Sequence, residues 1–495
     1  MYANLIRIDR NSSESLQTQI RRQLAIAIVN RQFPIHRPLP SIRKLSKDLG
    51  VSVTTVSLAY ESLKQDGFVE SRDRAGIYIR EDALLSSQAS QDLYTSPANS
   101  SDTDVIKMDF NSHFRGRSFN MPRVVKPSDS LVRFRFPFIC GLIDPNLFPI
   151  ASWRECIRDS VNVVEMRNWA TDYSSIDDEL LVEQLMQRVL SKRGIIAHPE
   201  EILITLGGQQ ALYLAVKLLL RTGETIGIED PGYPDILNMA QMENLNVRRL
   251  PIDKGGMILS DEINQCKCLY TTPSHQFPTT VTMPVERREE LLRITAQNRQ
   301  FIIEDDYEAE IAFDKTPPPA LKSLDRCGNV IYAGSLSKSL MPGLRIGYLV
   351  ADREFIREAK ALRHHILRHP PVNNQRSVAL FLQRGYFDRF LAKISNEYKA
   401  RCKTMHQSLE AHFPGASVLP EFGGGSIWLK LPEDIDAGKL QQKVMESSVY
   451  FETGGFTFSN PSENLNHIRL GYSVIDNALI PEGIELIAKA ALREK

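Results

Sequence analysis

A break in composition at residues 83–105 most strongly limits how this chain can fold. The segment ALLSSQASQDLYTSPANSSDTDV is rich in Ser, Gln, Asn, Asp and Thr, whereas regularly spaced apolar residues occur on both sides of it. Such a segment offers too little apolar surface to fold alone and is typical of a flexible tether. The chain of 495 residues is also longer than a single domain usually is. We therefore expect separate folding units joined by a linker over 83–105.

The charge is distributed unevenly between these parts. The chain has 60 basic and 60 acidic side chains, but residues 1–80 hold 13 Lys and Arg against seven Asp and Glu. The net charge is thus +6 before the linker and −6 over the remaining residues. A concentrated basic segment attracts nucleic acid, so the overall balance does not exclude a nucleic-acid partner.

Several classes of protein are disfavoured by simple patterns. No apolar run is long enough to span a bilayer, and residues 1–10 lack the apolar core of a signal peptide. The six cysteines are scattered, so we expect reduced thiols and a cytoplasmic protein without a membrane partner. His365 and His369 are four residues apart, but no carboxylate or cysteine accompanies them at ligand spacing. Together with His364 they are interpreted as a basic helix face, and we predict no metal site.

The first eighty residues contain three helical patterns, over 13–30, 41–50 and 52–67, followed by two strand patterns over 68–71 and 76–80. Gly50 makes a tight turn, and Ser52 is a good N-cap for the third helix. Two helices joined in this way are typical of a helix-turn-helix, whose second helix lies in the major groove. The first two helices alone would fit a protein-interaction domain equally well.

Beyond the linker, β-type runs alternate with helical stretches, which predicts a mostly parallel sheet covered by helices. From residue 386 a long helical pattern precedes strand patterns that are typical of a smaller α+β unit. We expect an N-terminal domain over 1–82, a large α/β domain over 106–385 and a small domain over 386–495. The β-type runs of the large domain are 202–205, 225–229, 301–304 and 330–332, and those of the small domain are 426–431, 449–452 and 467–472.

Lys338 follows one of the apolar β-runs, within YAGSLSKSLMPGLR. Considered alone, a lysine after a serine is more often a solvated surface cation than a Schiff-base residue. Thirty residues upstream, however, the strand IIEDDY ends in carboxylates and a phenol, and open α/β sheets bind ligands at such strand ends. A carboxylate there could keep a pyridinium nitrogen protonated, while a phenol could donate to the ring oxygen O3′. The sequence pattern alone does not decide whether that carboxylate is Asp305, Asp306 or Glu304.

A second pattern points to a phosphate. The run 202–205 leads into LGGQQ and an apolar helix, and a glycine turn at a helix N-terminus suits a phosphate group. Ser335, Ser337 and Arg345 would complete such a phosphate cup.

The string LPSIRKLSKDLGVSVTTVSLAYESLKQDGFVESRDRAGIYI, from residue 39, resembles the winged helix of GntR-type bacterial regulators, and the resemblance covers 13–80. It implies that Arg43 contacts a DNA phosphate or base and that Ser52, Thr54 and Thr55 lie at the tip of the recognition helix. Arg72 and Arg74, at the tip of the hairpin, suit a phosphate or the minor groove. Two departures concern DNA reading: Val53 stands where an arginine is usual, and Arg74-Ala75-Gly76 replaces the usual Gly-Ser-Gly of the wing.

Residues 140–475 resemble the fold-type I, class I/II aminotransferases. Together with the winged helix, the phrases EDPGYP (229–234), TPSHQFPT (272–279) and YAGSLSKSLMPGLRIGY (332–348) resemble the MocR-type regulators. The resemblance implies a Schiff base between Lys338 and pyridoxal 5′-phosphate, and a carboxylate clamp at Arg469. It further implies that Asp305 pairs with the pyridine nitrogen, Tyr307 meets O3′, Tyr233 stacks on the ring, and Gly208, Gln209, Ser335, Ser337 and Arg345 hold the phosphate.

The same resemblance implies a head-to-tail homodimer in which Tyr173 reaches the phosphate of the neighbouring subunit. Two departures lie near this site. Thr280 replaces a usual glycine, and the segment 174–178 replaces a usual glycine-containing turn.

These patterns predict a ligand-responsive transcription regulator that binds operator DNA and senses an amine or amino acid through pyridoxal phosphate. A variant of this hypothesis is a repressor that senses pyridoxal phosphate itself. The alternative is an active aminotransferase with an appended DNA-binding domain, because none of the catalytic residue types is missing.

Overall fold

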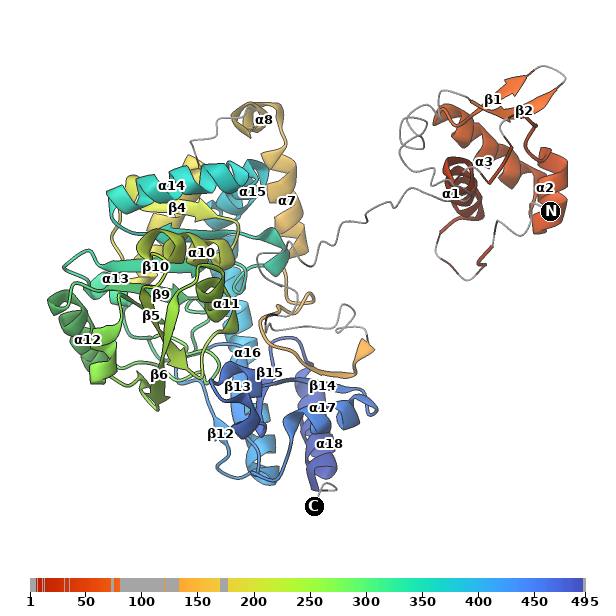
Figure 1. The fold of residues 1–495 in the computed structure, drawn as a ribbon. Helices are drawn as coiled ribbons and strands as arrows, with labels where there is room; N and C mark the ends of the chain where they lie inside the picture. The colour runs from red at the N-terminus through yellow and green to blue at the C-terminus, as the bar shows by residue number, and fades with distance from the viewer. Residues whose placement is uncertain are drawn as a thin grey trace, which may run out of the picture. The chain divides into compact units, whose positions relative to one another are not determined.

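The computed structural model describes residues 6, 8–10, 12, 14–30, 32–34, 36–72, 75–80, 121, 133–169 and 177–492. The chain divides into two compact units, residues 1–113 and 114–495. Figure 1 shows both units as ribbons.

The first unit contains three helices, α1 (Leu16–Val29), α2 (Ile42–Leu49) and α3 (Val53–Gln65), and a hairpin of β1 (Val69–Arg72) and β2 (Gly76–Ile79). The side chains that the helical spacing turns inward, such as Ile20, Leu24, Leu45, Val56 and Leu63, form a common core. The winged helix-turn-helix predicted from the sequence is confirmed.

Local capping sets the geometry between α2 and α3. Gly50 ends α2 in the left-handed conformation with φ of 62°, which favours glycine. Ser52 then begins α3 by accepting a 3.0 Å hydrogen bond from the backbone N–H of Thr55. The hydroxyl of Tyr60 donates to the carbonyl of Pro40, 2.8 Å away, which ties α3 to the start of α2.

The second unit is built on an eight-stranded sheet with the order β4-β11-β10-β9-β8-β5-β6-β7. The neighbouring pairs from β10 to β6 are parallel, whereas β11 runs antiparallel to both β10 and β4. This sheet confirms the predicted α/β class. Its strands are β4 (Ile202–Thr205), β5 (Thr225–Asp230), β6 (Asn246–Asp253), β7 (Gly256–Met257), β8 (Cys268–Thr271), β9 (Phe301–Asp306), β10 (Val330–Ser335) and β11 (Gly347–Val350).

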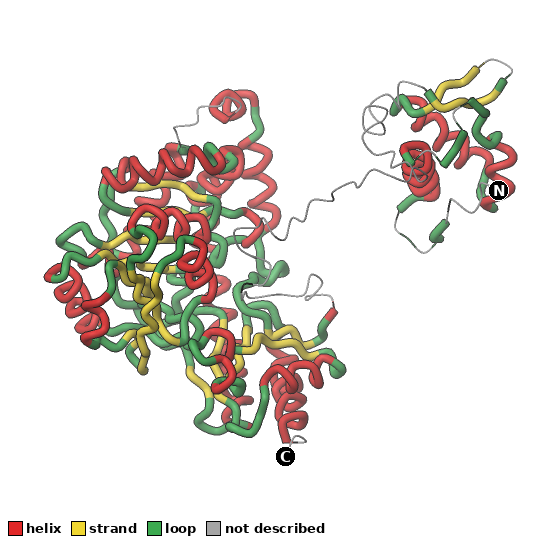
Figure 2. Tube along the Cα trace, viewed as in Figure 1, coloured by secondary structure: helices red, strands yellow, loops and turns green. Residues whose placement is uncertain are grey.

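Helices cover both faces of this sheet, as Figure 2 shows for helices in red around strands in yellow. One face packs against α10 (Gly208–Leu219), α11 (Pro234–Met242) and α14 (Arg353–Leu367). The other face packs against α9 (Glu179–Gln184), α12 (Val285–Gln297) and α15 (Val372–Gln383). Two further helices, α7 (Ile150–Ser160) and α8 (Val163–Trp169), precede the sheet along the chain.

A smaller five-stranded sheet, four of whose strands follow the long helix α16 (Tyr386–His412), has the order β12-β13-β15-β14-β3. β3 (Phe136–Phe138) is not among the predicted strands. It lies far upstream in the chain and pairs in parallel with β14, so this sheet joins two distant segments. The other strands are β12 (Ser417–Val418), β13 (Ser426–Lys430), β14 (Val449–Thr453) and β15 (His467–Gly471), and the sheet packs with α17 (Ala437–Met445) and α18 (Ile480–Leu492).

Thr280, which replaces a usual glycine, occupies a strained position. Its φ is 67°, in the left-handed region that a β-branched residue rarely adopts, and its side chain is fully buried. Its hydroxyl has no hydrogen-bond partner. A residue held in this way costs about 1–3 kcal/mol, so the surrounding structure must enforce the conformation.

Among the described helices, none is both long and apolar enough to cross a membrane.

Candidate functional site

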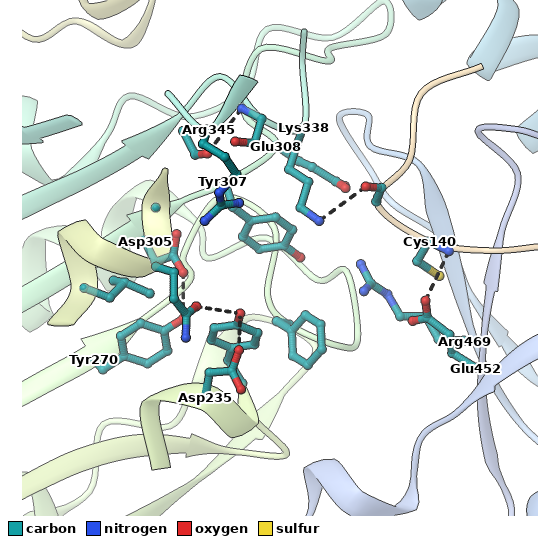
Figure 3. A pocket seen from close by; sticks show the side chains of 18 residues that line it. Cys140, Asp235, Tyr270, Asp305, Tyr307, Glu308, Lys338, Arg345, Glu452 and Arg469 are labelled. Carbon is teal, nitrogen blue, oxygen red and sulfur yellow. Dashed lines mark hydrogen bonds between the residues drawn. The ribbon is translucent and has the colours of Figure 1, made fainter. Parts of the chain in front are cut away.

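A cavity of about 360 Å³ opens beside the carboxyl ends of β9 and β10 and is closed on its other side by the smaller sheet. Figure 3 shows side chains from both sheets pointing into it. The cavity gathers nearly all of the aminotransferase-type residues named above: Gly208, Gln209, Tyr233, Asp305, Tyr307, Ser335, Ser337, Lys338, Arg345 and Arg469 all line it.

The side-chain alternation of β9 separates the three candidate carboxylates. Asp305 faces the cavity. Asp306 points to the opposite face, where it accepts hydrogen bonds from Nε of Arg193 at 2.8 Å and from the hydroxyl of Tyr332 at 2.9 Å. Glu304 accepts from two backbone N–H groups at the start of α13 (Leu321–Leu324). Only Asp305 is therefore placed to meet a ligand in this cavity.

Asp305 is held by a residue that the sequence patterns do not single out. The hydroxyl of Tyr270, on β8, donates to its Oδ2 at 2.8 Å. Asp305 is only 9% exposed, and burial raises its pKa to about 7 although the hydrogen bond from Tyr270 opposes the shift. Lys338 also opposes the shift, but burial outweighs both effects, so this carboxyl group is partly protonated at neutral pH.

We predict that Asp305→Asn stabilises the cofactor-free protein at pH 8. The folded-state pKa of Asp305 lies above the unfolded value, so the folded state holds the extra proton between about pH 4 and pH 7. Stability is therefore lost as the pH rises through that window, by on the order of 4 kcal/mol for this group. Asparagine cannot ionise, so the gain should appear in urea unfolding at pH 8 and nearly vanish at pH 4.

Asp306→Asn is the matched control, because it changes the adjacent carboxyl group on the opposite face. Arg193 lowers the pKa of Asp306 against the effect of burial. Asp306→Asn removes the charge partner of the buried Arg193 guanidinium, and breaking a buried ion pair in this way typically costs about 3–5 kcal/mol of stability. Stabilisation by both variants, or by neither at pH 8, would contradict the assignment.

Lys338, Tyr307 and Tyr233 line the cavity from three different elements. Nζ of Lys338, just after β10, donates to the carbonyl of Gly141 at 3.4 Å. The hydroxyl of Tyr307 is buried and has no hydrogen-bond partner. Tyr233, before α11, packs edge-to-face on Phe277 with ring centroids 5.2 Å apart, and its hydroxyl donates to Asp235 at 2.9 Å.

Polar donors gather at the N-terminus of α10. A Cβ on Gly347 of β11 would lie 2.4 Å from the carbonyl carbon of Gly207, so these backbones touch. Ser335 lies beside Gly208, and the Ser337 hydroxyl is buried without a partner. Arg345 reaches the same turn, where its guanidinium donates to the carbonyl of Leu206 at 3.2 Å. A helix N-terminus, an unused hydroxyl and a guanidinium together form a site of anion-binding chemistry.

Arg469 on β15 is a buried cation on the other side of the cavity. It is 7% exposed, and its Nε donates to the Ser426 hydroxyl at 3.1 Å. Its guanidinium lies 4.8 Å above the centre of the Phe277 ring. No carboxylate of a described residue lies within ion-pair distance of it. Burial alone would lower its pKa, yet acidic groups around the cavity, including Glu452 and Glu308, raise it, so the charge is retained.

Two of the predicted site residues, Tyr173 and Arg74, lie outside the described residues, as do residues 174–176 of the 174–178 departure. Conversely, the cavity contains residues that the sequence patterns did not predict, namely Cys140, Gly141, Leu212, Asp235, Tyr270, Phe277, Glu308 and Glu452. Three of these had a visible signal: Glu308 directly follows the IIEDDY strand, Asp235 directly follows EDPGYP, and Phe277 lies within TPSHQFPT.

Most of the predicted DNA-reading residues that the structure describes in the first unit are exposed along α2 and α3, whereas Thr55 is half-buried. Arg43 on α2 and the N-terminal residues Ser52 and Thr54 of α3 are exposed. The hydroxyls of Ser52 and Thr55 contact each other at 2.7 Å. Val53 is 50% exposed between them, and its isopropyl group can contact a thymine methyl but cannot hydrogen-bond guanine.

Arg72 on the hairpin is exposed but already engaged. Its Nε donates to Glu70 at 2.8 Å, and its guanidinium lies 4.5 Å from the ring centre of Tyr78. This ion pair offsets its charge, so Arg72 is a weaker candidate for a phosphate contact than Arg43.

Comparison with known proteins identifies both units. Residues 144–487 match the family "Aminotransferase class I and II", and residues 16–79 match "Bacterial regulatory proteins, gntR family". The HTH-type transcriptional regulator TauR of Rhodobacter capsulatus is 37% identical over 96% of both chains. The probable rhizopine catabolism regulatory protein MocR of Rhizobium meliloti is 27% identical over 98% of this chain and 95% of that protein.

Solved aminotransferases share the fold of the second unit. The kynurenine aminotransferase of Pyrococcus horikoshii superposes with a TM-score of 0.69 at 28% identity, over 78% of this chain and 98% of that chain. LysN, an α-aminoadipate aminotransferase from Thermus thermophilus, gives a TM-score of 0.70 at 26% identity, over 78% and 99%. This fold implies dependence on pyridoxal phosphate, and the gntR-type domain implies DNA binding. The chain therefore belongs to the MocR-type regulators, in which a GntR-type winged helix is joined to an aminotransferase class I and II domain.

Proposed function

We propose that this regulator binds operator DNA through its winged helix, in the cytoplasm, and senses an amine or amino acid through pyridoxal phosphate held in the cavity. The observation that carries the proposal is Arg469, a buried guanidinium with no carboxylate partner among the described residues, in the same cavity as Lys338. A buried cation of this kind needs an anion, and the carboxylate of an amino acid would provide one.

The donors of the cavity fit the cofactor. Asp305 would hold the pyridine nitrogen, because a protonated nitrogen beside it would stabilise the ionised carboxylate, which burial disfavours. The unpartnered hydroxyl of Tyr307 would donate to O3′, and Tyr233 would stack on the ring. Gly208, Gln209, Ser335, Ser337 and Arg345 would hold the phosphate, and Lys338 would hold the cofactor covalently. When bound, the cofactor supplies an aldehyde that condenses with amines and a ring that withdraws electrons.

The residues of this chain would then convert ligand binding into a signal. An incoming amine would displace Nζ of Lys338, and Arg469 would orient the carboxylate of that amine. Because Arg469 lies on β15 of the smaller sheet and Lys338 lies just after β10 of the larger one, a ligand that bridges them favours one arrangement of those sheets over others. We propose that a head-to-tail homodimer, with Tyr173 reaching the partner's phosphate site, passes this change to the DNA-binding domains.

Parallel titrations of the cofactor-loaded protein test this function. We expect a panel of amines and amino acids to contain compounds that change the visible spectrum and, over the same concentration range, change operator affinity by about 5- to 150-fold. Sustained formation of a 2-oxo acid at about 1–1000 per second, with operator affinity unchanged, would instead support the active aminotransferase. A change of operator affinity on adding pyridoxal phosphate alone would support a sensor of the cofactor itself.

A further inference from the structure

A second ionisable group in the cavity lacks a hydrogen-bonded counter-charge. Glu308, immediately after Tyr307, lines the same space as Lys338 and Arg469. Its side chain is 4% exposed, and its Oε2 atom is buried without any hydrogen-bond partner. Buried carboxylate oxygens are nearly always hydrogen-bonded, so an unused one that lines a ligand cavity needs an explanation.

The residues around Glu308 do not satisfy it. Nε2 of His275 is 3.5 Å from Oε2 of Glu308, yet neither atom has a hydrogen-bond partner. Burial lowers the pKa of His275 to about 4, so this imidazole is neutral and supplies no positive charge. Arg469 lies beyond ion-pair distance and is directed toward the cavity over Phe277.

Glu308 also lacks a partner when the charged groups of the proposed cofactor and effector are included. If the proposed function holds, the ring nitrogen faces Asp305, the phosphate faces Arg345, and the effector carboxylate faces Arg469. Asp235 accepts from Tyr233, and Glu452 accepts the backbone N–H of Cys140 at 3.3 Å. In this scheme, neither a residue nor a cofactor atom donates a hydrogen bond to Oε2 of Glu308.

We propose that Glu308 sets the effector class: a diamino acid, whose carboxylate would meet Arg469, whose first amine would displace Nζ of Lys338 from the cofactor, and whose second, protonated amine would bind Glu308. The inference rests on the proposed function. The same carboxylate rejects dicarboxylic amino acids, because a second anion would lie against a buried like charge.

Three amino acids of similar length test this specificity by the visible spectrum of the cofactor-loaded protein. Ornithine carries a second ammonium, norvaline an apolar chain and glutamate a second carboxylate. We expect ornithine to bind about tenfold or more tightly than norvaline, and glutamate to bind about tenfold or more weakly. Glu308→Gln keeps the shape without the charge, so all three affinities should fall within about threefold of one another.

Glu433→Gln is the matched control, because it makes the same change at a solvent-exposed glutamate. This variant should preserve the wild-type ranking of the three affinities. If Glu308→Gln fails to fold, Glu308→Asp keeps the charge on a shorter side chain. It should retain the ranking of the three amino acids with smaller differences in affinity. Equal binding of the three amino acids by the wild type, or an unchanged ranking in Glu308→Gln, would overturn the inference while leaving amine sensing intact. A spectrum that no amine changes would overturn the proposed function and this inference with it.

Discussion

Lys338→Ala is expected to abolish covalent attachment of pyridoxal phosphate and every response to amines, while leaving a folded protein that binds operator DNA. Lys338 lines the cavity with Nζ near the carbonyl of Gly141, and among the described lining residues it is the only lysine. The first unit has its own core, so DNA binding does not depend on this side chain. Borohydride reduction followed by peptide mapping should place the pyridoxyl label on Lys338 in the wild type and on no residue in the variant.

Lys403→Ala, at an exposed lysine of α16, is the matched control and should retain label, spectrum and amine response. Thermal unfolding of both variants separates loss of attachment from loss of fold. A pyridoxyl label on another lysine, or an operator response to amines that survives in Lys338→Ala, would refute the role of this residue.

Much of the architecture follows from local patterns in the sequence. The apolar spacing of 13–30, the turn at Gly50 and the N-cap at Ser52 specify the winged helix through interactions within a few residues. The strands β4, β5, β9 and β10 are short apolar runs bounded by turn residues, and each was predicted near its observed position. Helix and strand periods are local properties, so one sequence suffices to reveal them.

The parts that were not predicted depend on contacts between distant segments. β3 has three residues, too few to show a period, and it becomes a strand only by pairing with β14 about 310 residues later. Tyr270 lies on the buried strand β8, and nothing in the local run CLYT marks its hydroxyl as part of a site. Its hydrogen bond to Asp305 arises because β8 and β9 are neighbours in the sheet.

The ambiguity among the carboxylates of IIEDDY shows the same limit. The alternation of a strand implies that Asp305 faces away from Glu304 and Asp306, but it does not say which face carries the ligand. The placement of Arg193 and α13 on one face, and of Tyr270 and Lys338 on the other, decides the matter. Likewise, the unmatched charges of Arg469 and Glu308 become visible only when the smaller sheet closes the cavity.

We further predict that the double variant Arg43→Ala/Thr54→Ala of the full chain weakens operator binding by roughly 100-fold at physiological salt. Both side chains are exposed on α2 and the N-terminal end of α3, and the Arg43 guanidinium forms no ion pair with a described residue. Each lost base or phosphate contact typically costs about 1–3 kcal/mol. Lys64→Ala, at the far end of α3, is the matched control and should bind nearly as the wild type does.

Salt dependence of the single variant Arg43→Ala then distinguishes the two contacts proposed for this residue. A phosphate contact releases about one counterion, so its loss should lower the slope of log affinity against log salt by about 0.9 and weaken all DNA sequences alike. A base contact should leave that slope nearly unchanged and relax the preference at one operator position, because sequence is read at base edges. Wild-type affinity that ignores salt, or a double variant that binds operator normally, would remove these residues from the DNA interface.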